Sequence, residues 1–126
     1  MTSRDSATGL TAFQMDALES GLMAERERAL ARLEASERTL ADIVSYSEGS
    51  PPDDEHDPEG STIAYERAQV SALITQSRNH LAGLDQALGR LRNCTYGVCE
   101  RCCNRIVFER LLARPTARTC VGCAVG

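Results

Sequence analysis

Two stretches of the sequence, residues 12–46 and 61–92, repeat apolar side chains with the period of an α-helix. The second stretch carries a seven-residue repeat made by Val70, Ser77, Leu84 and Leu91. The stripe positions between them are filled by Leu73, Ile74, Leu81 and Leu88. This spacing is typical of a coiled-coil seam. The first stretch has a looser stripe of Met15, Leu18, Leu22, Leu30, Leu33, Leu40 and Ile43. The pattern predicts two long helices.

The first helix has a start signal and two interruptions. Thr11 and Gln14 have the spacing of a capping box, so we expect the helix to begin directly after Thr11. Residues 1–10 are small, polar and aperiodic, and they predict a disordered tail. Further along, Arg26 and Glu37 fall on the apolar stripe and interrupt it.

The two stretches are separated by SEGSPPDDEHDPEGS, residues 47–61, which contains three of the four prolines. Such a segment predicts a loop, after which Asp57 or Ser61 caps the second helix. Two striped helices joined by a short loop bury their stripes most simply as an antiparallel hairpin, here residues 11–93 with a tip at 47–60. A compact helical bundle, or a dimer that uses the same stripes, is the alternative. The tip is acidic, with Glu48, Asp53, Asp54, Glu55, Asp57 and Glu59.

All six cysteines lie in the last thirty-three residues, which we treat as a module, residues 94–126. Two Cys-x-x-Cys pairs, Cys99 with Cys102 and Cys120 with Cys123, are separated by seventeen residues. This is the pattern of a four-thiolate zinc site. Because four thiolates leave no open coordination position, we expect one structural Zn²⁺ per chain that supplies folding free energy.

The remaining residues of the module leave several interpretations open. A small core is expected from Ile106, Val107, Phe108, Leu111 and Leu112. The arginines between the cysteine pairs are either solvated surface or contacts for phosphate or an acidic partner. Cys94 and Cys103 stand outside the ligand set. Cys103 replaces Cys102 as a ligand, stays a spare thiol, or pairs with Cys94 on oxidation.

Composition narrows the class of protein. With two Phe, three Tyr and no Trp in 126 residues, a globular core would be thin. No stretch is long and apolar enough for a membrane span, and the N-terminus lacks the features of a signal peptide. We therefore expect a cytoplasmic protein, in which cysteine pairs hold metal rather than form disulfides. The net charge of −4 argues against non-specific nucleic-acid binding by the whole chain.

The run from Tyr96 to Cys123 resembles the C4-type zinc finger of the DksA/TraR family. The family pattern is Y-G-x-C-x-x-C-G-x-x-I, then R-L-x-A-x-P-x-A, then C-x-x-C. The matching residues are Tyr96, Gly97, Cys99, Cys102, Ile106, Arg110, Leu111, Ala113, Pro115, Ala117, Cys120 and Cys123. The preceding helical hairpin with an acidic tip extends the resemblance over most of the rest of the chain.

The resemblance implies a bacterial transcription regulator that binds RNA polymerase, is not an enzyme, and does not itself bind promoter DNA. In the family, the hairpin enters the secondary channel of the polymerase, and a D-x-x-D-x-A motif at the tip approaches the catalytic magnesium region. Asp54 and Asp57 supply the two aspartates here, with Glu55 and Glu59 in support. A thin rod suits a channel, and carboxylates suit metal ions and basic side chains.

The chain departs from the family pattern at three places. Glu59 stands where the motif has alanine, and an alternative alignment starts the motif at Asp57 and replaces its second aspartate by Gly60. Cys103 replaces a glycine at a position where a left-handed backbone is easiest for Gly. Members that respond to guanosine tetraphosphate carry basic residues at positions that correspond to Gln76, His80, Gly83 and Ala124. None of these is basic, so we do not expect that response.

Two other functions compete with polymerase regulation. A nucleic-acid-binding zinc module would use Arg101, Arg105, Arg110, Arg114 and Arg118. A thiol sensor would use Cys94 or Cys103 to control zinc retention. The acidic loop would in either case be a solvated turn. No His, Ser and carboxylate constellation suggests an active site, so we do not expect an enzyme.

Overall fold

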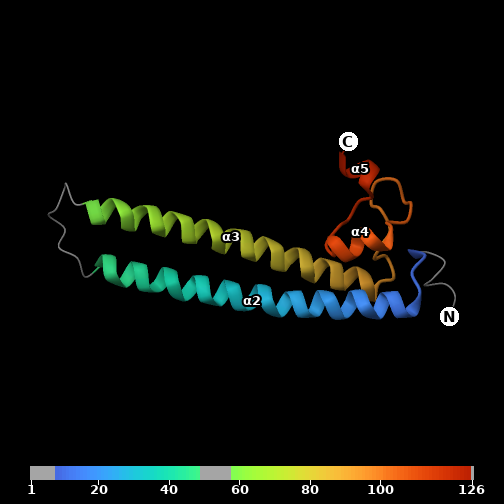
Figure 1. Cartoon of the computed structure of the whole chain (residues 1–126), viewed down its shortest axis with the longest axis horizontal. Helices are drawn as coiled ribbons and strands as arrows, with labels where there is room; N and C mark the ends of the chain where they lie inside the picture. The colour runs from blue at the N-terminus through green and yellow to red at the C-terminus, as the bar shows by residue number, and fades with distance from the viewer. Residues whose placement is uncertain (1–7, 49–57, 126) are drawn as a thin grey trace. The chain divides into compact units, whose positions relative to one another are not determined.

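The computed structural model describes residues 8–48 and 58–125, and these ranges are dominated by two long helices. Helix α2 spans Ala12–Glu48 and helix α3 spans Pro58–Arg92. Two short helices, α4 (Phe108–Ala113) and α5 (Val121–Val125), follow in the cysteine-containing part (Figure 1). Within the described ranges there is no strand, and the isolated antiparallel bridge of Val98 with Arg105 is the β-type pairing. The predicted all-α fold class is therefore confirmed.

The ends of the long helices follow from local sequence signals. The Thr11 N–H donates to Gln14 Oε1 over 2.9 Å, and the Gln14 N–H donates to Thr11 Oγ1 over 3.1 Å. These two bonds are the predicted capping box, which satisfies backbone donors that the helix leaves unpaired. Helix α3 begins at Pro58 rather than at Ser61. Proline is suited to a first turn because its φ is fixed near the helical value and no helical N–H is needed there.

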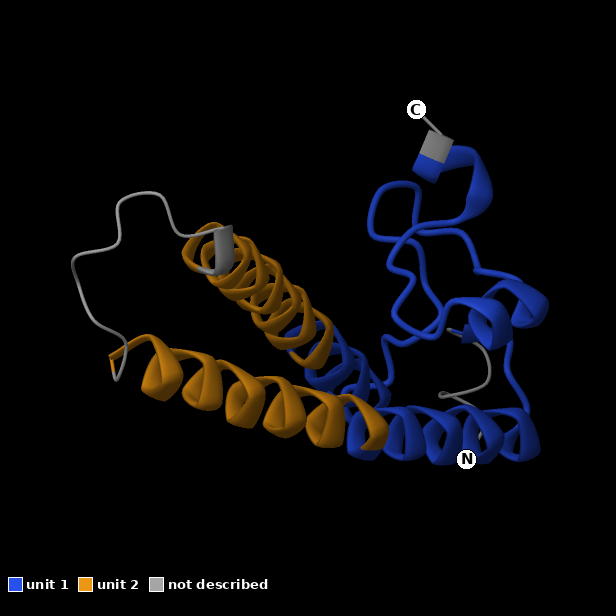
Figure 2. Ribbon diagram, turned by 60° about the vertical axis from the view of Figure 1, so that its left-hand side comes forward, with its two compact units in different colours: residues 1–27, 82–126 blue, residues 28–81 orange. Residues whose placement is uncertain are grey.

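The chain divides into two compact units (Figure 2). Unit 1 comprises Met1–Glu27 and Ala82–Gly126, and unit 2 comprises Arg28–Leu81. Unit 1 buries apolar side chains from both long helices and from the cysteine-containing segment: Met15, Leu18, Leu22, Leu84, Ala87, Leu88, Leu91, Tyr96, Ile106 and Leu111. The cysteine-containing segment thus shares one core with the adjoining parts of α2 and α3.

Unit 2 has a thinner core. Its buried apolar side chains, among the described residues, are Ala29, Leu33 and Ile74. Leu30, which the stripe was predicted to bury, is 38% exposed, and Ala29 is buried in its place. The reason is the helical period, because seven residues from Leu22 return within about 20° of the same face whereas eight overshoot it by about 80°. Leu73 is also half-exposed, beside the buried Ile74.

The two residues that interrupt the stripe of α2 pair across to α3. In unit 1, Arg26 Nε lies 2.6 Å from Asp85 Oδ1. In unit 2, an Arg78 guanidinium nitrogen lies 2.8 Å from Glu37 Oε2. As one partner advances along α2 the other moves back along α3, so the two helices pair antiparallel. Both ion pairs are exposed to solvent, so they stabilise the helix pair only weakly.

The tail predicted for residues 1–10 is wrong over its described end. Thr8 and Leu10 are buried, and the Leu10 N–H donates to Thr8 Oγ1 over 3.3 Å. Two glycines with positive φ permit this packing: a Cβ on Gly9 would lie 2.5 Å from Arg105 Cδ, and one on Gly97 would lie 3.2 Å from Leu10 Cδ1. Leu10 alone gives no periodic signal, so the sequence could not reveal that this residue is buried. Residues 1–7 lie outside the described ranges.

None of the helices in the described ranges is both long enough and apolar enough to span a membrane.

Candidate metal centre

The structure brings the four cysteines of the two Cys-x-x-Cys pairs together in unit 1. The Sγ atoms of Cys99, Cys102, Cys120 and Cys123 all lie within 4.8 Å of one another. The Sγ atoms of Cys102 and Cys120, one from each pair, are 3.7 Å apart. A tetrahedron of thiolates around Zn²⁺, with Zn–S near 2.3 Å, has S···S edges of about 3.8 Å. The donor set and its size therefore fit one tetrahedral thiolate-bound metal ion.

The first pair is held in a tight turn. The bridge of Val98 with Arg105 closes this turn, and within it the Cys99 N–H donates to Asn104 O over 2.8 Å. The Cys103 N–H donates to Cys99 O over 3.0 Å. These bonds turn the chain back within a few residues, which places the two sulfurs of the pair on the same side.

The second pair lies at the start of α5. The Ala124 N–H donates to Cys120 O over 2.9 Å, so Cys120 precedes the single helical turn that carries Cys123. One helical turn brings residues three apart to the same face. The short helix thus aims both sulfurs of the second pair at the sulfurs of the first.

The backbone around the sulfurs favours the thiolate at two positions. The backbone N–H of Cys102 donates to the Cys99 sulfur and lowers the pKa of Cys99 to about 6. The backbone N–H of Cys123 likewise lowers the pKa of Cys120. Hydrogen bonds to the neighbouring thiols, first that of Cys120, raise the pKa of Cys123 to about 12. Crowded sulfurs cannot all carry charge without a cation, and a bound metal ion supplies that charge.

A buried tyrosine joins the first cysteine pair to the segment before the second. Tyr96 is 0% exposed, and its hydroxyl donates to Pro115 O over 2.8 Å. Burial raises the pKa of Tyr96 to about 12, because the charged phenolate is disfavoured away from water. The hydrogen bond of Tyr96 thereby connects the segment before the first cysteine pair to the segment before the second.

Two arginines hold the second cysteine pair in place. Arg110 Nε donates to Thr119 O over 2.9 Å, directly before Cys120. Arg118 Nε lies 3.0 Å from Glu100 Oε1, and the Glu100 N–H donates to Arg118 O over 2.9 Å. Both pairs of cysteines are thus fixed by contacts from the opposite segment.

Parts of the chain match known proteins in sequence. No family model matches the chain. It is 42% identical over 66 residues to "Uncharacterized protein YteA" of Bacillus subtilis. This match covers 52% of the chain and 28% of that protein. It is 34% identical over 68 residues to "General stress protein 16O" of the same organism. This match covers 54% of the chain and 42% of that protein. The chain thus spans less than half the length of these curated relatives.

A solved structure extends the likeness over nearly the whole chain. The transcription factor DksA2 from Pseudomonas aeruginosa superimposes with a TM-score of 0.78 and 27% sequence identity, over 90% of this chain and 82% of that one. Together with the four-cysteine cluster, this match decides the type of protein. The chain is a DksA/TraR-like zinc-finger protein.

The small core predicted for the finger of this DksA/TraR-like protein is only partly right. Ile106 and Leu111 are buried, whereas Val107 and Leu112 are exposed. Val107 lies at the extended N-cap of α4, and a six-residue helix presents only one face to the core. Leu111 occupies that face, and Leu112, the next residue, points about 100° away.

Cys94 and Cys103 lie outside the four-sulfur cluster of the DksA/TraR-like centre. Both have a left-handed backbone, with φ of 61° at Cys94 and 62° at Cys103. Cys94 lies in the turn that follows α3, where the Thr95 N–H turns back to donate to Arg90 O over 2.9 Å. Cys103 is exposed and occupies the position where the family pattern has glycine. A redox role for either thiol stays a prediction.

The arginines proposed for nucleic acid have different surroundings in the DksA/TraR-like finger. Arg110 and Arg118 bind within the finger itself, as described above. The side chain of Arg105 lies over Gly9. Arg101 and Arg114 are exposed. Three of the five predicted contacts therefore have a structural role, which weakens the nucleic-acid alternative.

The side chains of the four predicted acidic-tip residues lie outside what the structure describes. Asp54, Glu55 and Asp57 lie outside the described residues. Glu59 lies in the first turn of α3, but its side chain is also outside the description. The role of these four residues in contacting a partner stays a prediction.

Proposed function

We propose that the chain is a non-enzymatic transcription regulator that binds RNA polymerase in the cytoplasm. The likeness to the transcription factor DksA2 over 90% of the chain carries this proposal. The cysteine centre supports it, because four converging thiolates saturate a tetrahedral ion and leave no position for a substrate or water. The centre serves to hold the finger against the parts of α2 and α3 in unit 1.

We infer that the metal is Zn²⁺, one ion per chain, bound by Cys99, Cys102, Cys120 and Cys123. The sulfur-only donor set suits a soft or borderline ion, and the 3.7 Å sulfur separation suits a tetrahedral one. The free energy of metal binding adds to the stability of a finger that has few buried apolar side chains of its own.

The contact with the polymerase is proposed to lie at the segment between α2 and α3. In this proposal the paired helices enter the secondary channel, and Asp54 and Asp57, supported by Glu55 and Glu59, approach the catalytic region. Carboxylates are attracted to bound cations and to basic side chains, which gives an acidic segment a reason to bind there. The chain is not proposed to read DNA sequence or to depend on guanosine tetraphosphate.

Two measurements test this function. The purified chain should be retained by core RNA polymerase and should change the lifetime of open complexes at promoters. The double variant Asp54→Ala with Asp57→Ala should keep polymerase binding and lose the effect on open complexes. The matched control is Asp16→Ala with Glu19→Ala, which removes two exposed carboxylates of the same spacing from α2. Failure to bind polymerase would refute the function, and an unchanged tip variant would refute only the role of the tip.

A further inference from the structure

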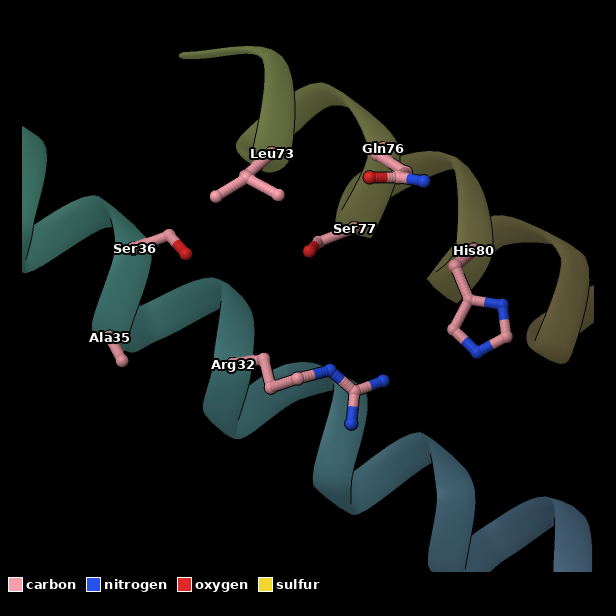
Figure 3. Close-up of a pocket in the computed structure, with 7 residues that line it drawn as sticks. All are labelled: Arg32, Ala35, Ser36, Leu73, Gln76, Ser77 and His80. Carbon is pink, nitrogen blue, oxygen red and sulfur yellow. The ribbon is translucent and has the colours of Figure 1, made fainter. Parts of the chain in front are cut away.

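A groove of about 550 Å³ lies between α2 and α3 in unit 2 (Figure 3). Two of the side chains that line it, Arg32 and His80, already have interactions within the chain. Neither is therefore an unpaired group that would favour a ligand in the groove. The feature without an assigned role lies instead in unit 1, where residues 8–10 pack against the segment that carries the first cysteine pair.

This N-terminal segment is held by two parts of the finger. A Cβ on Gly97 would lie 3.2 Å from Leu10 Cδ1 and 3.8 Å from Thr8 Cβ, so both side chains lie against the backbone at Gly97. A Cβ on Gly9 would lie 2.5 Å from Cδ and 2.8 Å from Nε of Arg105, so the arginine side chain covers Gly9. Thr8 and Leu10 are accordingly only 1% and 3% exposed. We call these three residues the N-terminal strap.

The strap lies where the two ends of the first cysteine turn meet. The Ile106 N–H donates to Gly97 O over 2.7 Å, and Val98 forms its bridge with Arg105. The first cysteine pair lies between these two ends of the turn. Because the ligands of a closed tetrahedral centre must separate before the ion can leave, a contact that keeps this turn closed should slow the release of metal.

We propose that the N-terminal strap is a clamp on the first cysteine pair that slows the loss of the metal ion. Leu10 is its main positioning residue and acts through the backbone at Gly97, two residues before Cys99. Arg105 holds the strap by covering Gly9, and its Cδ is the nearest atom, so the apolar stem of the side chain takes part in this contact. This inference rests on the proposed metal centre and does not depend on polymerase binding.

The test is the rate at which the metal-loaded full chain transfers zinc to an excess of a coloured chelator, without denaturant. Leu10→Ala should release zinc at least about tenfold faster than the parent, because burial of a leucine side chain contributes more free energy than that factor requires. Leu10→Met keeps the side-chain volume and should release zinc at nearly the parental rate. A parental rate in Leu10→Ala would overturn the clamp. A parent chain that binds no zinc would refute the metal centre itself.

Leu22→Ala separates a local clamp from a general loss of stability. Leu22 is 0% exposed in the same unit and lies about one helical turn before Arg26, whose ion pair with Asp85 joins α2 to α3. Its truncation should lower the urea midpoint at least as much as Leu10→Ala does. It should have little effect on zinc release, because release requires only the local opening of the turn. Equal acceleration of release in the two variants would refute the clamp.

Hydrogen exchange of the metal-loaded Leu10→Ala variant shows where the chain opens. The N–H groups of Cys99 and Ile106 donate within the first cysteine turn, and that of Ala124 donates at the second pair. Exchange should become faster at Cys99 and Ile106 and stay unchanged at Ala124. Equal acceleration at all three amides would show that the strap supports the whole finger and would contradict a clamp on the first pair.

Arg105 provides a second test that leaves the strap residues intact. Arg105→Ala uncovers Gly9 and should speed zinc release, whereas Arg105→Met keeps an apolar stem and should not. Arg101→Ala is the matched control, because Arg101 is exposed and lies between the two cysteines of the first pair. Its release rate should equal that of the parent. Faster release in Arg101→Ala and not in Arg105→Ala would assign the effect to charge near the sulfurs and overturn the clamp.

Discussion

The hydroxyl of Tyr96 donates a 2.8 Å hydrogen bond to the carbonyl oxygen of Pro115, nineteen residues along the chain. Tyr96 lies three residues before Cys99, and Pro115 lies five residues before Cys120. The bond therefore connects the segments that precede the two cysteine pairs. It gives a physical reason for a tyrosine at this position of the motif, because a hydroxyl removed from water needs a hydrogen-bond acceptor.

Removing the hydroxyl should loosen this connection. Tyr96→Phe keeps the buried ring but leaves the Pro115 carbonyl without its donor, so the free energy of unfolding should fall by about 1–2 kcal/mol. Urea unfolding of the metal-loaded protein measures this. Tyr65→Phe is the matched control, because Tyr65 is 65% exposed and the same change there should stay within about 0.5 kcal/mol. Equal losses in the two variants would contradict the role of the bond.

The same tyrosine should make the protein sensitive to alkali. Its pKa is raised from 10.0 to about 12 by burial, so the folded state holds the phenol proton more strongly than the unfolded state. The resulting stability is fully present below pH 10 and is lost as the pH rises through about 12. Tyr96→Phe has no proton to lose there. The stability difference between the parent and this variant should therefore shrink between pH 10 and 12, and a constant difference would contradict the argument.

The metal should be required for the core of unit 1. Chelation should increase hydrogen exchange of amides around Tyr96, Ile106 and Leu111, because the segments that bury these side chains are tied to the four sulfurs. Metal analysis should give one zinc per chain in the parent and in Cys94→Ser. Cys123→Ser should lose most of the metal. Loss of metal in Cys94→Ser to the same extent would show that the ligand set is wrong.

The N-terminal segment should contribute to the same unit. Gly9→Ala places a side chain at a φ of 72° and within 2.5 Å of Arg105 Cδ, so unfolding free energy should fall by about 1 kcal/mol or more. Gly21→Ala is the control, because Gly21 lies in α2 and, apart from its chain neighbours and the nearby backbone of that helix, no atom lies within 4 Å of the added Cβ. That substitution should stabilise the protein by up to about 1 kcal/mol through helix propensity. Urea midpoints that shift in the same direction would contradict the docking of this segment.

Local signals predicted much of this structure. The capping box at Thr11, the two helices and the convergence of the cysteine pairs each depend on residues close in sequence or on fixed ligand spacing. The pattern could not show that Arg26 pairs with Asp85, because that contact joins residues 59 positions apart. The burial of Thr8 and Leu10 depends in the same way on distant segments. The sequence indicated only that the stripe was interrupted.

The last prediction concerns Cys103, which adopts a φ of 62° outside the metal cluster. A left-handed backbone costs a non-glycine residue about 1–2 kcal/mol, while glycine loses more entropy on folding. Cys103→Gly should therefore stabilise the protein by about 0.5–1 kcal/mol and keep one zinc per chain. Urea unfolding and metal analysis check both parts. Loss of zinc in this variant would show that Cys103 is a ligand, whereas slower zinc release than the parent under mild peroxide would assign it a redox role.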